Sequence, residues 1–311
     1  MYAKIKTMKK CLIVILLCLA SLTNAQQLPM YSQYLTNDFI LNPAIAGSKP
    51  YFPIQINSRA QWSGLGTIAP KTNTLSYHMP LAYDAIGIGA IVMQDETGPY
   101  SQIGLTLSFA YHIQLNEYNA TRLSLGLSGL MTQHTLNQDE LTFHNPDPEF
   151  QGSYSKLVPD ASFGAYLYSN NFSLSASAHQ LFESIFKKSV QDIFGDNSQV
   201  RHYFAHASYR INIYSDLVFE PSLLVKSTEV SPTQLDVNAR VIIDNNYWAG
   251  LSFRSSKSLI VLAGLNIGNI FLSYSYDYGI SSLSSVASGS HEVSLAFNVN
   301  DKRNRRHSYY W

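Results

Sequence analysis

One segment of the chain alternates strictly between large apolar residues and small or polar ones. Residues 103–113 read Ile-Gly-Leu-Thr-Leu-Ser-Phe-Ala-Tyr-His-Ile, with every odd-numbered position large and apolar. A period of two predicts a β-strand with one apolar and one polar face, and the length matches the roughly 9–11 residues that a tilted strand needs to cross a bilayer. We expect an outward apolar face and an inward polar face, made respectively by Ile103, Leu105, Leu107, Phe109 and Tyr111 and by Thr106, Ser108 and His112.

The first 25 residues read as an export signal rather than as part of the fold. Lysines between Lys4 and Lys10 precede the apolar run Cys11–Leu22, and Thr23-Asn24-Ala25 offers a small-residue cleavage site. The run is too short for a comfortable retained anchor, and Leu17 precedes Cys18 where a lipidated cysteine needs a small residue. Both cysteines lie in this signal, so the mature chain has no disulfides and no thiol chemistry.

Composition decides between a soluble sandwich and a membrane barrel, which alternation alone does not separate. Charged residues are 14% of the chain, against roughly 25% for an ordinary soluble domain. Aromatic residues are 13%, led by 21 Tyr, as in a protein with an interfacial aromatic girdle. The formal net charge of zero gives no reason to expect a nucleic-acid partner. No apolar stretch after the signal approaches 18 residues, so we expect strands and no spanning helices.

The alternating segments are even in number, and their connections alternate in length. Short gaps such as 170–171 and 244–246 interchange with long ones such as 61–71, 95–102 and 132–159. This is how bacterial outer-membrane barrels are built, with short turns in the periplasm and long loops outside. We therefore predict one antiparallel up-and-down transmembrane barrel over residues 51–300, integral to the outer membrane of a Gram-negative bacterium. Its fourteen expected strands are 52–60, 72–80, 86–94, 103–113, 121–131, 160–169, 172–178, 200–211, 217–226, 235–243, 247–254, 259–265, 270–278 and 291–299.

Four segments lie outside this strand pattern. Residues 26–50 have no strand period and are expected to plug the lumen or to cap its periplasmic end. Residues 132–159 read as an irregular loop, and 179–195 as either a short amphipathic helix over the barrel mouth or a loop with packed apolar side chains. The basic and aromatic tail 301–311 is either a periplasmic docking segment or a disordered end.

The histidines do not form a pattern that predicts catalysis or metal binding. His202 and His206 share a strand face but would lie about 13 Å apart, too far to ligate one ion. In Ser290-His291-Glu292, alternation sends His291 to the opposite face from its neighbours, which rules out a nucleophile–base pair among them. We expect no catalytic, cofactor or metal site, and we expect His78 and His112 to be hydrogen-bonded inside the barrel or at an interface.

Two groups of residues are candidates for binding a partner. Arg59, Gln61 and Trp62 lie at the outward end of the first strand, where Trp62 either joins the aromatic girdle or, with Arg59, anchors a partner. Tyr34, Asn42 and Pro43 lie in the N-terminal segment, where they either only shape the backbone or also contact a partner.

Several motifs in register resemble the PorP/SprF family of Bacteroidetes membrane proteins. They are Ser32-Gln33-Tyr34, Asn42-Pro43-Ala44-Ile45-Ala46-Gly47, Arg59-Ala60-Gln61-Trp62-Ser63-Gly64, Pro70-Lys71-Thr72 with Ser76-Tyr77-His78-Met79-Pro80, Gly87–Gly89 with Asp95-Glu96-Thr97-Gly98, Ala110-Tyr111-His112-Ile113, Tyr274-Ser275-Tyr276-Asp277 and Gly289-Ser290-His291-Glu292-Val293-Ser294-Leu295. The resemblance covers essentially the whole mature chain. The chain departs from it by adding 301–311 after the last strand.

The resemblance implies a non-enzymatic outer-membrane barrel of the type IX secretion and gliding machinery. Such a protein would assist the export or surface attachment of an adhesin-like secreted protein with a C-terminal sorting domain. Its partners would be that protein, other type IX components and outer-membrane lipid. The alternative from the residues is a channel for small hydrophobic solutes, gated by 179–195 and the N-terminal segment. A rim enzyme acting on lipid is the third and weakest possibility.

Overall fold

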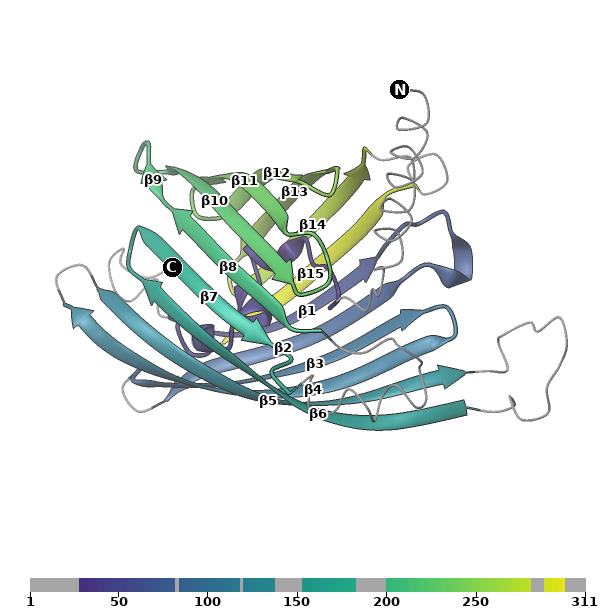
Figure 1. Cartoon of the computed structure of the whole chain (residues 1–311). Coiled ribbons are helices and arrows are strands. Elements are labelled where there is room, and N and C mark those ends of the chain that lie inside the picture. The colour runs from purple at the N-terminus through teal and green to yellow at the C-terminus, as the bar shows by residue number, and fades with distance from the viewer. Residues whose placement is uncertain are drawn as a thin grey trace, which may run out of the picture.

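The chain folds into a closed antiparallel β-barrel in its computed structural model, which describes residues 28–81, 84–117, 120–137, 153–182, 200–280 and 288–299 (Figure 1). The expected export signal, residues 183–195 of the helix or loop predicted over 179–195, and the tail 301–311 lie outside the described residues. Within the described residues, no helix is long and apolar enough to span a membrane.

Neighbouring strands of the barrel pair antiparallel in sequence order, and the last strand pairs with the first. Phe52 at the start of the first strand lies opposite Val299 at the end of the last one. The strands are β1 (Phe52–Ala60), β2 (Lys71–Leu81), β3 (Ile86–Thr97), β4 (Tyr100–Asn116), β5 (Thr121–Asn137), β6 (Ser153–Tyr168), β7 (Phe172–His179), β8 (His202–Tyr209), β9 (Ile211–Asn212), β10 (Leu217–Thr228), β11 (Gln234–Ile243), β12 (Tyr247–Arg254), β13 (Ser258–Ile267), β14 (Ile270–Gly279) and β15 (Ser290–Val299).

These strands fill fourteen positions in the wall, as predicted. The short β9 follows β8 after a break at Arg210, and both pair with β10, so together they fill one position in the wall. The predicted bounds of β1 and β12 are confirmed.

The alternation in β4 has the predicted orientation. Ile103 and Leu107 are 55% and 59% exposed on the outer surface, whereas Ser108 and His112 on the other face are buried. The other strands repeat this arrangement, with large apolar residues outside and Ser, Thr, Asn and charged residues inside. In water such a surface would be strongly unfavourable, so its solvent is the membrane.

Two predicted loops are wrong in extent. β5 continues to Asn137 and β6 begins at Ser153, because backbone pairing between them persists where the apolar alternation fades. β3 and β4 join through a tight turn at 98–99 instead of a long loop, with Gly98 at φ +54°. A positive φ suits glycine, which has no Cβ to clash with the backbone.

An N-terminal stretch lies inside the wall and forms short 3₁₀ turns instead of strands (Figure 1). These turns are η1 (Gln33–Leu35), η2 (Asp38–Leu41) and η3 (Pro43–Ile45), and a fourth, η4 (Gly66–Ile68), lies between β1 and β2. We refer to residues 28–50 as the lumenal segment. It contacts β3 to β6 through η3 and β14 and β15 through η1, on different sides of the barrel.

Candidate functional site

The site that the fold builds is the contact between the lumenal segment and the inner wall. At one end of the barrel, buried charged side chains from five strands come together. They form what we call the outer charge cluster, because it lies at the end where the long connection 280–289 joins β14 to β15. Its members are Arg59, Asp236, Arg254, Asp277 and Glu292, all buried.

Arg59 is the centre of the outer charge cluster. Its Nη2 lies 2.6 Å from Asp277 Oδ2 and its Nη1 lies 3.1 Å from Glu292 Oε2. Arg254 lies 3.0 Å from Asp236 Oδ2 and 3.5 Å from Asp277 Oδ2. Charges removed from water are stable only when they are paired and hydrogen-bonded, and here each arginine faces two carboxylates.

The lumenal segment supplies further hydrogen-bond donors to this cluster. The backbone N–H of Ser32 donates to Glu292 Oε2 at 2.7 Å, and that of Gln33 donates to Glu292 Oε1 at 3.3 Å. The Ser32 hydroxyl donates to Asp277 Oδ2 at 2.8 Å. Hydrogen bonds to an ionised carboxylate are among the stronger ones in proteins, so the first turn of the segment is fixed to β14 and β15.

The middle of the segment contacts strands on both sides of β14 and β15, namely β11, β1 and β2, through buried polar side chains. The Tyr34 hydroxyl donates to Asn238 Oδ1 at 3.0 Å, and burial raises the pKa of this phenol, so it stays protonated and keeps its donor. The Asn37 amide donates to Asn57 Oδ1 at 3.1 Å and to Ser76 Oγ at 2.9 Å.

Two inward-facing histidines form hydrogen bonds with the end of the segment, inside the barrel as the sequence predicts. His78 Nδ1 accepts a hydrogen bond from the Gly47 backbone at 3.1 Å. His112 Nε2 donates to the Ala46 carbonyl at 2.8 Å, and its Nδ1 lies 3.0 Å from the Tyr168 hydroxyl.

Two further histidines contact the backbone of the same segment. His179 Nε2 donates to the Leu41 carbonyl at 2.7 Å, and His202 Nε2 accepts from the Leu28 N–H at 3.2 Å. Within the described residues no group of three or more His, Cys, Asp or Glu is arranged to hold a metal ion.

Asn42 joins the segment to β6 and β7. Its side-chain amide donates to the Ala165 carbonyl at 2.9 Å and to Ser175 Oγ at 3.1 Å. Its Oδ1 accepts from the Ala44 N–H at 2.8 Å and so caps η3. Pro43 occupies the first position of that turn, where its fixed φ suits the start of a helix and its missing N–H is no loss.

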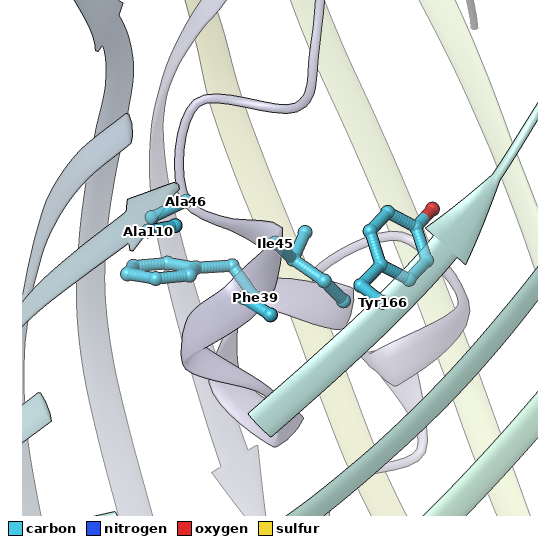
Figure 2. Close-up of a cluster of buried hydrophobic side chains, with 6 residues drawn as sticks. Phe39, Ile45, Ala46, Ala110 and Tyr166 are labelled. Carbon is cyan, nitrogen blue, oxygen red and sulfur yellow. The ribbon is translucent and has the colours of Figure 1, made fainter. Parts of the chain in front are cut away.

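Glycines in the wall allow the segment's backbone to approach closely. A Cβ atom on Gly87 would overlap the Ala46 carbonyl, and one on Gly126 would overlap the backbone of Ala44. Beside these glycines Phe39, Ile45 and Ala46 pack against Ala110 of β4 and Tyr166 of β6 (Figure 2). Polar and apolar contacts therefore fix the same face of the segment.

The structure separates the residues that the sequence singled out for partner binding. Arg59, Tyr34, Asn42 and Pro43 are buried within the site just described. Gln61 is half-buried and Trp62 is 38% exposed, in the connection that follows β1. A role in binding a partner stays a prediction for all six.

Sequence reasoning missed the carboxylates that hold Arg59. Asp277 and Glu292 are 218 and 233 residues away in the chain. One signal was present, since alternation predicts that Glu292 faces inward with Ser290, and both are buried. A carboxylate facing inward on a membrane-spanning strand needs a cationic partner.

The comparison with known protein families agrees with the barrel fold described above. Residues 23–297 match the family described as type IX secretion system membrane protein PorP/SprF. The chain belongs to this family. As a PorP/SprF protein with a closed barrel of outward-facing apolar residues, it is an outer-membrane protein. The motif residues Ser32, Asn42 and Arg59, which carried the resemblance, all lie where the lumenal segment meets the wall.

Solved structures of other outer-membrane proteins are similar at low identity. The chain aligns with Omp33 of Acinetobacter baumannii at 10% identity, over 81% of this chain and 99% of that one, with a TM-score of 0.44. It aligns with a Pseudomonas aeruginosa FadL homologue at 12% identity, over 84% and 93%, with a TM-score of 0.46. The KdgM porin gives 9% identity, over 79% and 98%, with a TM-score of 0.40. No curated protein matches the chain.

Proposed function

We propose that this PorP/SprF barrel is a non-enzymatic component of the type IX secretion system that assists the export or surface attachment of a secreted partner. The partner would be an adhesin-like protein with a C-terminal sorting domain. Membership of the family supports a role in this system. The observation that carries the proposal further is the lumenal segment, which occupies the inside of the barrel where a pore would run.

We propose that the lumenal segment acts as a plug. The outer charge cluster, four histidines and the glycines of the wall all contact it, and they belong to strands all around the barrel. Moving it would expose several buried ions and leave their hydrogen bonds unmade, which is costly in a low-dielectric interior. A barrel filled in this way is better suited to binding other proteins than to conducting solutes.

Partner recognition would then lie with the outward connections. Trp62 is the large aromatic residue on the connection 61–70, and its backbone N–H donates to Ser290 Oγ at 3.2 Å. The next N–H, of Ser63, donates to the Gly289 carbonyl at 2.9 Å. An exposed Trp on a backbone fixed at two points is a suitable binding anchor, because little conformational entropy is lost when a partner binds. Arg59, near the end of β1, would hold the start of this connection in place.

Affinity purification of the tagged protein from outer membranes, with identification of the captured proteins, tests the proposal. We expect a secreted protein with a sorting domain, and we expect its surface amount to fall when the gene is deleted. If deletion leaves every secreted and surface protein unchanged, the proposal is wrong.

A channel for small hydrophobic solutes is the alternative, and it requires the lumenal segment to leave its place. Conductance and solute uptake with the purified barrel in liposomes distinguish the two functions. We expect no stable open-pore current from the intact chain. Sustained conductance, or uptake of a hydrophobic solute, would favour the channel.

A further inference from the structure

At the end of the barrel where short turns join the strands, the structure contains a pocket. The empty space in and around it is about 810 Å³ when the open solvent at its mouth is counted. Its rim includes Ala120 of the β4–β5 turn and Asn170 of the β6–β7 turn, and its floor is the lumenal segment at Tyr34 and Leu35. Short turns of outer-membrane barrels face the periplasm, so this periplasmic pocket opens to that compartment.

The walls of the periplasmic pocket carry more positive than negative charge. Asp38 is paired with Lys49 at 2.9 Å. Glu220 is paired with Arg240 of the lining at 2.5 Å and with Arg210, which is not a lining residue, at 2.8 Å. The lining therefore holds three cations, Lys49, Arg122 and Arg240, against the two carboxylates of Asp38 and Glu220.

Of the cations that line the pocket, Lys49 and Arg240 are paired with carboxylates of the described residues and Arg122 is not. Its Nε donates to Gln114 Oε1 at 2.7 Å and its Nη1 to the Asp84 carbonyl at 3.4 Å, both neutral oxygens. Among the described residues no carboxylate oxygen lies within 4.0 Å of it, since none of their ion pairs includes this side chain. A partly enclosed guanidinium without a carboxylate attracts an anion, and its planar fork matches a carboxylate in particular.

Three residues of the pocket lining also carry a buried polar atom without a partner in the described part of the chain. Arg240 Nε, His206 Nε2 and Ser48 Oγ have no hydrogen-bond partner within the described residues, although each residue forms part of the wall. Buried polar atoms normally have partners. Because these atoms are closed to solvent, a ligand could reach them only after their side chains move.

Aromatic rings form the side of the pocket next to Arg122. Tyr166 and Tyr168 stack with their ring centroids 4.7 Å apart and an interplanar angle of 14°. Both line the pocket together with Tyr34. The faces of these rings provide apolar contact area for a flat or branched hydrocarbon group. Because Arg122 lies beside them, this wall suits a ligand with an apolar group and a negative charge at one end.

We propose that the periplasmic pocket binds a carboxylate attached to an aromatic or aliphatic body, with Arg122 as its main anchor. Two sources share this chemistry: the free C-terminus of a peptide that ends in an apolar residue, and a small aromatic acid. This inference goes beyond the proposed function, and it stands whether or not a secreted protein binds the outward connections.

Calorimetric titration of the detergent-solubilised full chain tests it. The probes are 3-phenylpropionate and its uncharged amide, the tripeptide Gly-Gly-Phe and its C-terminal amide, and inorganic phosphate. We expect each acid to bind at least about tenfold more tightly than its amide, a difference of about 1.4 kcal/mol. Tighter binding of the tripeptide acid than of 3-phenylpropionate would identify a peptide as the source, and equal binding a small acid.

Variants locate the binding. Arg122→Gln should weaken binding of the acid at least about tenfold, and Arg122→Lys, which keeps the charge, should weaken it less. The matched control is Arg201→Gln, because Arg201 pairs with Glu229 at the other end of the barrel. A preserved heat-modifiable gel shift shows that each variant is folded. Equal binding of acid and amide, phosphate binding as tight as that of the acids, or unchanged binding in folded Arg122→Gln would each overturn the proposal.

Discussion

Asn42 packs directly on Gly164, so that a Cβ atom at position 164 would overlap the Asn42 amide oxygen. Gly164 is also the register partner of Gly126 in the β5–β6 ladder, and a Cβ on Gly126 would overlap the backbone of Ala44. Two neighbouring strands therefore lack side chains at the place where the lumenal segment crosses them. The wall and the segment are shaped for each other.

We expect Gly164→Ala and Gly126→Ala to destabilise the docked segment. Overpacking a closely packed contact typically costs about 1–3 kcal/mol, and here the added methyl group meets main-chain atoms or a capping side chain that cannot move freely. The matched control is Gly129→Ala in β5, where a Cβ meets nothing within 4 Å. The measurements are the temperature of the heat-modifiable gel shift and protease cleavage within residues 28–50. Equal behaviour of all three variants would contradict the close-contact argument.

Loss of the Arg59 charge should destabilise the barrel far more than loss of an exposed arginine. Arg59→Gln leaves Asp277 and Glu292 buried without their shared cation, and breaking a buried pair costs about 3–5 kcal/mol. Arg201→Gln removes an ion pair whose side chains are 32% and 47% exposed, worth about 0–1 kcal/mol. Urea unfolding in detergent micelles compares the two. Similar midpoints would mean that the outer charge cluster adds little to stability.

The wall of this protein was predictable because its pattern is local. Ile103 to Ile113 carries a period of two that survives in the structure, and the same holds for 52–60 and 247–254, whose bounds are confirmed. The prediction was wrong where the pattern weakens. Beyond Met131 both faces of β5 become polar, and β5 and β6 remain strands there only because their backbones pair.

The site was predictable only in part because its contacts span the whole chain. Alternation places His78, His112 and Glu292 on the inner face, which is where they are. The pairing of Arg59 with Glu292 depends on closure of the barrel, which makes them direct register neighbours in β1 and β15. The path of the lumenal segment has no periodic signal, since irregular backbone is directed by individual hydrogen bonds such as those of Asn42.

Asn42→Asp should weaken the docking of the lumenal segment, although it only replaces the side-chain NH2 group with an oxygen. The Asn42 amide donates to the carbonyls of Ala165 and Ala176 at 2.9 and 3.2 Å, and a carboxylate has no hydrogen to donate. Two carbonyl oxygens would face a buried negative charge, with a cost of about 1–3 kcal/mol or more. Asn73→Asp is the control, because exposed Asn73 only accepts a hydrogen bond, from Ser58 Oγ. Faster cleavage of the segment in Asn42→Asp alone is the expected result, and identical cleavage in both variants would contradict it.

The proposed partner contact at Trp62 gives a prediction that separates binding from folding. Trp62→Ala removes a ring in a connection outside the strands, so we expect the barrel to stay folded, as the heat-modifiable gel shift would show. If Trp62 is an anchor, capture of the secreted partner should fall by about tenfold or more, as expected for a hot-spot residue. Ile68→Ala is the control, since Ile68 lies in the same connection and is 60% exposed. Quantitative recovery of partner from outer membranes measures the effect, and unchanged recovery with a folded Trp62→Ala barrel would move recognition to another part of the surface.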